Sequence, residues 1–243
     1  MDERNSNRLA SDFATYDHRR IAALRIVLGL LVVVGFVGAD RWFYENFCLW
    51  FNTPDTSDRD PYMVLKPLLT LVRLLAHASG IGLLYVILLL TKSDGFRRAN
   101  AFLMTVLLVA GAVAVMQTTI ARCRPNRADT HLAFHDFGEL SLSIQGVCFP
   151  SGEAAVAFTV GILMAQAFPR MRWLLYGLST MVAVARLLPG AHYPSDVLAS
   201  VLIALFVARP LFARFLEFQE YLIEWNGGSQ GFNDQSEPVL TNE

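Results

Sequence analysis

Charged residues are scarce in this chain. Asp, Glu, Lys and Arg make up 17% of its 243 residues, whereas hydrophobic residues make up 54% and the mean hydropathy is +0.40. This balance is too apolar for an ordinary soluble domain and indicates a polytopic membrane protein. The net charge of -1 lacks the basic excess that is typical of nucleic-acid-binding proteins, so we expect no nucleic-acid partner.

Cysteine is also rare, with three residues at positions 48, 123 and 148. This number excludes a disulfide-rich scaffold and a zinc centre built from cysteine alone. Cys123 and Cys148 remain compatible with one disulfide, which would require the oxidising outer side of a membrane, or with two free buried thiols. We expect no metal or organic cofactor, and no feature of the sequence indicates an oligomeric state.

Long apolar runs, by contrast, are abundant and predict six membrane-spanning helices. They cover residues 21–39, 74–90, 101–120, 153–168, 173–188 and 197 to past 210. The sequence therefore predicts an all-α protein with one six-helix membrane domain over residues 21–224. Residues 1–20 form a polar tail, and residues 225–243 are polar and predicted to be disordered.

The basic residues between these runs predict the orientation. The connectors at 92–98 and 170–172 and the pair Arg209 and Arg214 all fall on one side, which the positive-inside rule makes cytoplasmic. Both termini are then cytoplasmic, and the segments 40–73, 121–152 and 186–196 face outward. Residues 40–62 are aromatic and acidic, as expected for a loop at the outer membrane interface.

Polar residues gather in the outward segments. The first set ends the third run, with Gln117, Arg124 and Pro125, and arginine suits a phosphate because its planar fork donates paired hydrogen bonds. The second is Pro150–Glu153, where proline and small residues precede a helix whose free amide groups can bind an anion. Without a ligand, the same residues would be an ordinary helix cap.

The third set is Arg186, His192 and Asp196, which lies between the last two apolar runs. His192 and Asp196 are four residues apart, and Pro194 is well placed to start a helix, so both side chains can share one face. A carboxylate that accepts from one imidazole nitrogen fixes the tautomer and makes the other nitrogen a better base or nucleophile.

Together these motifs resemble the type 2 phosphatidic acid phosphatase / vanadium haloperoxidase superfamily, over about residues 100–205. The family pattern is Lys-x6-Arg-Pro, Pro-Ser-Gly-His and Ser-Arg-x5-His-x3-Asp. The resemblance implies that His192 attacks phosphorus to form a phosphohistidine and that Asp196 orients it. It also implies that the phosphoryl oxygens are bound by Arg124, Arg186, Ser151 and Gly152.

The chain departs from the family pattern at three positions. Gln117 replaces the lysine, although its amide can still donate to phosphate, and Arg73, Lys66, Arg122 or Arg127 can supply a cation. Ala185 replaces the leading serine of the third motif. Glu153 replaces the histidine expected to protonate the leaving alkoxide or activate water. We expect Glu153 to take that role, and the alternative is His131 or His135.

These two histidines are four residues apart beside Asp136, so they could also form a metal pair. The alternative interpretation is that they belong to a surface loop or contact the substrate.

The predicted function is hydrolysis of a lipid phosphate monoester or pyrophosphate at the extracytoplasmic face of the cytoplasmic membrane. By resemblance, the substrates are phosphatidic acid, phosphatidylglycerol phosphate, polyprenyl diphosphate or phosphorylated lipid A. The alternatives are a lipid phosphotransferase that uses the same intermediate and a non-catalytic protein that binds lipid phosphate.

Overall fold

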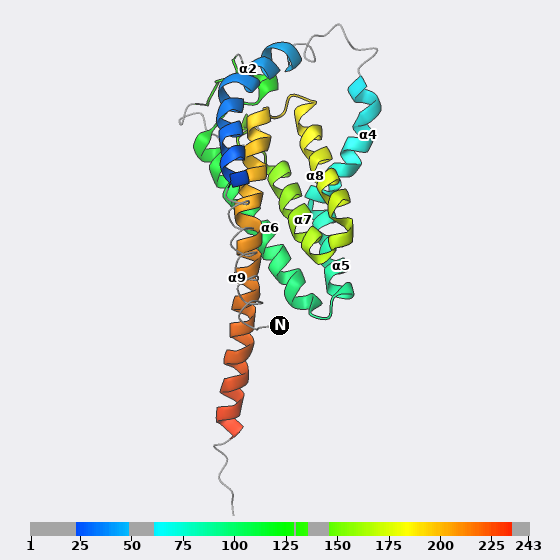
Figure 1. Cartoon of the computed structure of the whole chain (residues 1–243), viewed down its shortest axis with the longest axis vertical. Helices are drawn as coiled ribbons and strands as arrows, with labels where there is room; N and C mark the ends of the chain where they lie inside the picture. Colours follow the sequence, from blue (N-terminus) through cyan, green and yellow to red (C-terminus); the bar gives the residue numbers. More distant parts are fainter. Residues whose placement is uncertain (1–22, 49–60, 129, 136–145, 235–243) are drawn as a thin grey trace, which may run out of the picture.

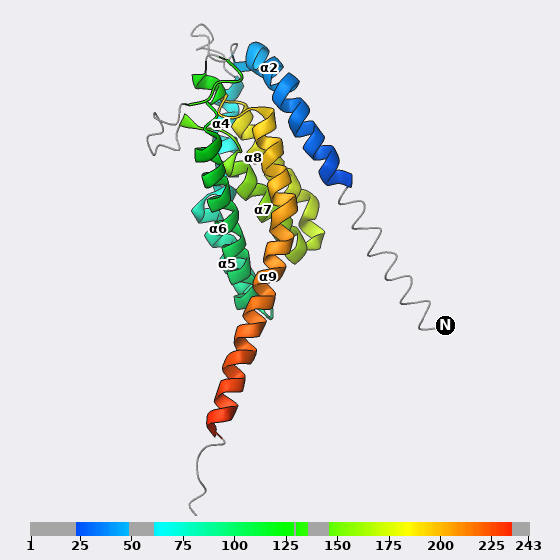
Figure 2. The same cartoon turned by 90° about the vertical axis from the view of Figure 1, so that its left-hand side faces the viewer.

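The computed structural model describes residues 23–48, 61–128, 130–135 and 146–234. In these residues the regular structure is helical, with isolated β-bridges only, so the predicted all-α class is confirmed. Figures 1 and 2 show an elongated bundle from which the end of the last helix projects. The longer helices are α4 (Pro61–Arg73), α5 (Ala78–Thr91), α6 (Gly95–Ile120), α7 (Gly152–Ala167), α8 (Arg172–Leu187) and α9 (Pro194–Asp234).

Three helices in the described part are long and apolar enough to cross a membrane: Ala23–Asn46, Gly95–Ile120 and Pro194–Trp225. A fourth candidate is the pair Pro67–Arg73 and Ala78–Thr91, which is bent by 51°. Helices α7 and α8 have 16 residues each, about 24 Å of helix, which is shorter than a typical hydrocarbon core of about 30 Å. Length and composition thus identify up to four spans here, and the six-crossing topology stays a prediction.

Helix α7 lies at the centre of the bundle and packs against α6, α8 and α9. It is apolar on all sides, as expected of a helix that neighbouring helices surround. Helices α7 and α8 pack closely together. Ser179 of α8 donates to the carbonyl of Ala157, and Gly161 leaves no room for a side chain, since an added Cβ would lie 2.3 Å from the Ser179 Oγ. This packing fixes the start of α7 relative to the end of α8.

The first helix is longer than the sequence predicted. After a π-helical turn (η1, Gly35–Ala39) it continues past residue 39 through α2 (Asp40–Phe43) and a second π-helical turn (η2, Tyr44–Cys48). The prediction that a loop begins at residue 40 is therefore wrong. The physical reason lies at Asp40, whose side chain is fully buried and ion-paired inside the bundle rather than solvated in a loop.

Two further boundaries differ from the prediction. A 3-10 turn (η4, Leu74–Ala76) separates α4 from α5, so the run predicted over residues 74–90 is not α-helical from its start, and the Lys66 side chain lies outside the described residues. At the other end, α9 runs to Asp234, beyond residue 225 where the disordered tail was predicted to begin. Residues 235–243 of that tail lie outside the described part.

Candidate active site

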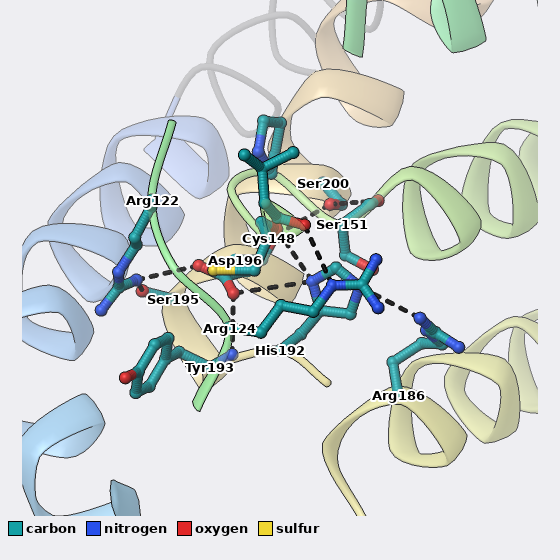
Figure 3. Close-up of polar contacts among 12 residues, drawn as sticks. Arg122, Arg124, Cys148, Ser151, Arg186, His192, Tyr193, Ser195, Asp196 and Ser200 are labelled. Atoms are coloured by element: carbon teal, nitrogen blue, oxygen red, sulfur yellow. Dashed lines mark hydrogen bonds and ion pairs between the residues drawn. The ribbon is translucent and has the colours of Figure 1, made fainter. Parts of the chain in front are cut away.

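His192 is 2% exposed and is held in the turn between α8 and α9. Its Nδ1 lies 2.8 Å from the Cys148 carbonyl oxygen, and its Nε2 lies 3.4 Å from Nη2 of Arg186 (Figure 3). A carbonyl only accepts, so the proton belongs on Nδ1, and Nε2 presents a lone pair toward Arg186. Burial lowers the pKa of His192, which favours this neutral form.

Asp196 fixes the start of α9 next to His192. Its Oδ2 accepts from the Tyr193 amide at 2.7 Å, as the third residue of a helix does for its N-cap, and Pro194 occupies the first helical position. The same oxygen lies 3.6 Å from Nδ1 of His192. The direct hydrogen-bond acceptor for the imidazole is therefore the Cys148 carbonyl, and the carboxylate acts on His192 at a slightly longer distance.

A buried ion-pair network lies on the other side of Asp196. The fully buried Arg122 donates through Nη1 to Asp196 Oδ1 at 2.8 Å and through Nη2 to Asp40 Oδ2 at 2.9 Å. Its guanidinium also stacks 3.9 Å from the Tyr193 ring centroid. Asp40 in turn accepts from the amide and the hydroxyl of Ser195. Because Arg122 is committed to these two carboxylates, it is not placed to replace the missing lysine.

The start of α7 forms the next side of the site. It follows a cis Phe149–Pro150 peptide bond, and Gln117 donates from Nε2 to the Pro150 carbonyl at 2.7 Å. The amide expected to reach phosphate thus braces this turn. The Ser151 Oγ is buried and has no hydrogen-bond partner among the described residues. A Cβ on Gly152 would meet only ordinary contacts at 3.7 Å or more, so packing within the protein does not demand glycine there.

Glu153 lies between two arginines in the first turn of α7. Its carboxylate accepts two hydrogen bonds from Arg73 at 2.7 and 2.8 Å, and its Oε1 lies 3.1 Å from Nη1 of Arg186. Because Arg186 also contacts His192, the Glu153 carboxylate is one guanidinium away from the imidazole. The three side chains Glu153, Arg186 and His192 therefore come together as the sequence motifs predicted.

Arg124 approaches the site from the segment after α6. A left-handed residue, Ala121 with φ of 53°, ends that helix, and the chain then pairs with the segment that leads to α7. Arg124 Nε donates to the Val147 carbonyl at 3.1 Å, next to the Cys148 carbonyl that holds His192. Figure 3 shows the Arg124 and Arg186 side chains extending toward His192.

This arrangement agrees with a comparison against known families. Residues 76–219 match the model of the PAP2 superfamily, which is more than half of the chain. The chain belongs to the PAP2 superfamily. The predicted resemblance is thereby confirmed, and the apolar helices agree with an integral membrane protein.

Two curated PAP2 relatives are lipid A 1-phosphatases. The protein of Rhizobium etli is 32% identical over 108 residues, 42% of this chain and 44% of the relative. The protein of Rhizobium johnstonii is 31% identical over 108 residues, 42% of each chain. The chain thus matches less than half the length of these relatives.

Two solved structures are also similar to this PAP2 chain. Aquifex aeolicus LpxE has a TM-score of 0.49 at 18% identity, and the match covers 65% of this chain and 90% of the LpxE chain. A PAP2 type phosphatidylglycerolphosphate phosphatase from Bacillus subtilis has the same TM-score and identity, and the match covers 88% of this chain and 98% of the Bacillus chain.

The PAP2 motifs did not reveal every residue at the site. Asp40 was missed because it follows an apolar run and resembles the acidic residues of a loop, and its pairing with Arg122 spans 82 residues of sequence. Arg73 was considered only as a substitute cation, not as the partner of Glu153. A carboxylate at the position of the family histidine was the signal that could have prompted a search for such a partner.

The remaining candidates lie elsewhere or play other parts. His135 contacts the Gly146 carbonyl through Nε2 at 3.4 Å, and the carbonyl of His131 accepts from Arg122. In the described residues no group of three or more His, Cys, Asp or Glu could hold a metal, and Asp136 lies outside them. Cys123 and Cys148 are not joined by a disulfide, and the Cys148 thiol instead donates to the Cys123 carbonyl at 3.1 Å.

Proposed function

We propose that this protein is a membrane lipid phosphatase that hydrolyses a phosphate monoester or pyrophosphate through a phosphohistidine at His192. The observation that carries the proposal is the arrangement around the imidazole. Nδ1 donates to the Cys148 carbonyl, and Nε2 keeps its lone pair beside Arg186. A neutral, oriented imidazole next to a phosphate-binding cation is what nucleophilic attack on phosphorus requires, whereas lipid binding alone does not need it.

In the first step, Nε2 of His192 attacks phosphorus, and the bond from phosphorus to the lipid oxygen breaks. The leaving lipid oxygen takes a proton from solvent, and the phosphoryl group stays on the imidazole. Arg124 and Arg186 stabilise the charge on the phosphoryl oxygens, because fixed cations cost no reorganisation during the reaction. The Ser151 hydroxyl and the first amides of α7 add donors, and Gly152 lets the phosphate approach the backbone closely.

In the second step, water attacks the phosphohistidine, and the bond between nitrogen and phosphorus breaks. We assign Glu153 as the base that takes the proton of this water. Two arginines surround its carboxylate and favour the ionised form, which suits a base better than an acid. This assignment refines the expected acid/base role of Glu153. Arg73 supplies a cation near the phosphate that Gln117 does not provide.

The substrate class follows from the relatives and from the membrane setting. Two relatives are lipid A 1-phosphatases, so a phosphorylated lipid A is the first substrate to test. Phosphatidic acid, phosphatidylglycerol phosphate and a polyprenyl diphosphate present the same terminal phosphoryl group. The proposed location is the cytoplasmic membrane with six crossings and cytoplasmic termini, and with His192 at the extracytoplasmic face, as the basic connectors predict.

The test is a phosphate-release screen over these four lipids with purified wild type and His192→Ala. We expect release by wild type, inhibition by vanadate as a pentacoordinate mimic of phosphoryl transfer, and no release by His192→Ala. Arg186→Gln should lose activity, whereas Arg170→Gln, which removes an exposed arginine, should not. Release by His192→Ala equal to wild type would refute the proposal. A newly phosphorylated alcohol in the mass spectrum would instead show phosphotransfer, and lipid-phosphate binding without release would show a binding protein.

Glu153→Gln tests the second step separately. The neutral amide should lower kcat by a factor of about 10² or more, as expected for loss of a general base. It should also tighten vanadate binding, because the carboxylate no longer competes with the anion for Arg73 and Arg186. A glutamate that only braces the helix would leave vanadate affinity unchanged or weaken it. Full activity of Glu153→Gln would contradict the assignment.

A further inference from the structure

A cavity lies between the first helix and helices α7, α8 and α9. Its volume is about 360 Å³, within the range of about 300–1,000 Å³ of small-molecule sites. Phe158, Ile162, Val201 and Leu205 contribute apolar walls. Figure 2 shows the first helix diverging from the bundle toward its N-terminal end, where this cavity lies.

The cavity is placed toward the basic end of the bundle. Along α9, Arg209 lies about 20 Å from Asp196. Tyr176, which also lines the cavity, belongs to the second turn of α8, just after the basic connector of residues 170–172. The arginine end of the cavity is therefore distant from the phosphate site, and it lies close to where the positive-inside rule places the cytoplasmic headgroups.

Two arginines, Arg25 and Arg209, belong to the lining of this otherwise apolar cavity. Arg25 donates to the Leu205 carbonyl at 3.2 Å and stacks 4.5 Å from the Phe206 ring centroid. Its Nε is nevertheless buried with no hydrogen-bond partner among the described residues. A buried donor without an acceptor is costly, and a ligand in this cavity that accepts from Arg25 would offset that cost.

From these observations we propose that this cavity binds an anionic phospholipid of the membrane leaflet opposite the active site. The acyl chain lies against the apolar walls, and the headgroup phosphate accepts from Arg25 and Arg209. Charge complementarity selects an anionic over a zwitterionic lipid, because a zwitterionic headgroup would bring its own cation close to the two arginines. This inference does not depend on the proposed phosphatase activity.

The test compares phosphatidylglycerol with phosphatidylcholine of the same acyl chains, added to the full-length protein in detergent with vanadate present to compete at the candidate active site. Native mass spectrometry counts bound lipids, and the unfolding temperature reports their effect. We expect phosphatidylglycerol to bind more tightly and to raise the unfolding temperature more. Arg25→Gln/Arg209→Gln should weaken its binding roughly 25-fold, because each arginine near a charged headgroup contributes a factor of about five.

The matched control is Arg170→Gln/Arg214→Gln, which removes two exposed arginines outside the cavity lining and should leave binding unchanged. If the Arg25→Gln/Arg209→Gln protein does not fold, Val201→Phe carries the test, because it fills the cavity and keeps both arginines. Val201→Phe should lose the bound phosphatidylglycerol. Equal binding of the two lipids, or a phosphatidylglycerol preference that survives in both variants, would overturn the inference. Occupation by a second copy of the chain, seen as a doubled protein mass, would overturn it as well.

Discussion

Asp40→Ala should destabilise the protein strongly, because Asp40 closes the buried network that joins the first helix to α9. The carboxylate accepts from Arg122 Nη2 and from the amide and hydroxyl of Ser195. Both side chains of the Asp40–Arg122 pair are 0% exposed, so water cannot replace the lost acceptor. Removing one partner of a buried ion pair costs about 3–5 kcal/mol. Because Arg122 keeps Asp196 as a second partner, we expect a value near the lower end, about 3 kcal/mol.

The assay is equilibrium unfolding in mixed micelles, and the same helix provides a matched control. Arg41 and Glu45 form an ion pair four residues apart, with side-chain exposures of 64% and 50%. Glu45→Ala should cost about 0.3–0.5 kcal/mol, as exposed pairs at this spacing do. Asp40→Asn keeps one acceptor and the side-chain shape, so its cost should lie between the two. A cost for Asp40→Ala no larger than that for Glu45→Ala would refute the reasoning.

The same substitution has a catalytic consequence if the proposed function holds. Asp40 reaches His192 only through Arg122 and Asp196, so it is a positioning residue. Asp40→Ala should therefore lower kcat while KM changes little, because the phosphate-binding residues Arg124 and Arg186 are not touched. A raised KM at unchanged kcat would assign Asp40 to substrate binding instead.

Local sequence patterns predicted much of the fold for a simple reason. Apolar runs bounded by proline, glycine or charged residues gave α7 and α8 within one residue of their ends in the structure. The motif spacings likewise brought Glu153, Arg186 and His192 together, because each motif sits at a helix end that the bundle places on the same side. Such features are encoded within a few residues of sequence.

Long-range pairings were not predictable in the same way. Asp40 was assigned to an interfacial loop because burying a carboxylate is unfavourable unless a partner neutralises it, and that partner lies 82 residues away. The Cys148 carbonyl that holds His192 is a backbone group, so no side-chain pattern identifies it. The bend at Leu74–Ala76 was missed because an apolar segment gives no sign of a 3-10 turn, although this bend separates Arg73 from the helix that follows.

Three further predictions concern titration, thiols and packing. Burial lowers the pKa of His192 from its ordinary 6.5, so the acid limb of kcat/KM should lie below pH 6.5, where the neutral nucleophile is finally lost. Asp196 raises that pKa, so Asp196→Asn should move the limb to still lower pH, and a shift to higher pH would contradict the electrostatics. Burial raises the pKa of the Cys148 thiol, so maleimide should label this thiol slowly in the folded protein. Because no disulfide joins Cys123 to Cys148, wild type and Cys123→Ser should migrate identically in gel electrophoresis without reductant. Gly161→Ala should cost about 1–3 kcal/mol, because the new Cβ would lie 2.3 Å from the Ser179 Oγ. Gly111, another helical glycine, has nothing within 4 Å of the position that an added Cβ would occupy, so Gly111→Ala should instead stabilise by about 0.5–1 kcal/mol. Ser179→Ala removes the clashing oxygen, so in a double-mutant cycle it should recover part of the free energy of unfolding that Gly161→Ala costs. Purely additive costs of the two substitutions would show that this contact does not limit the packing of α7 against α8.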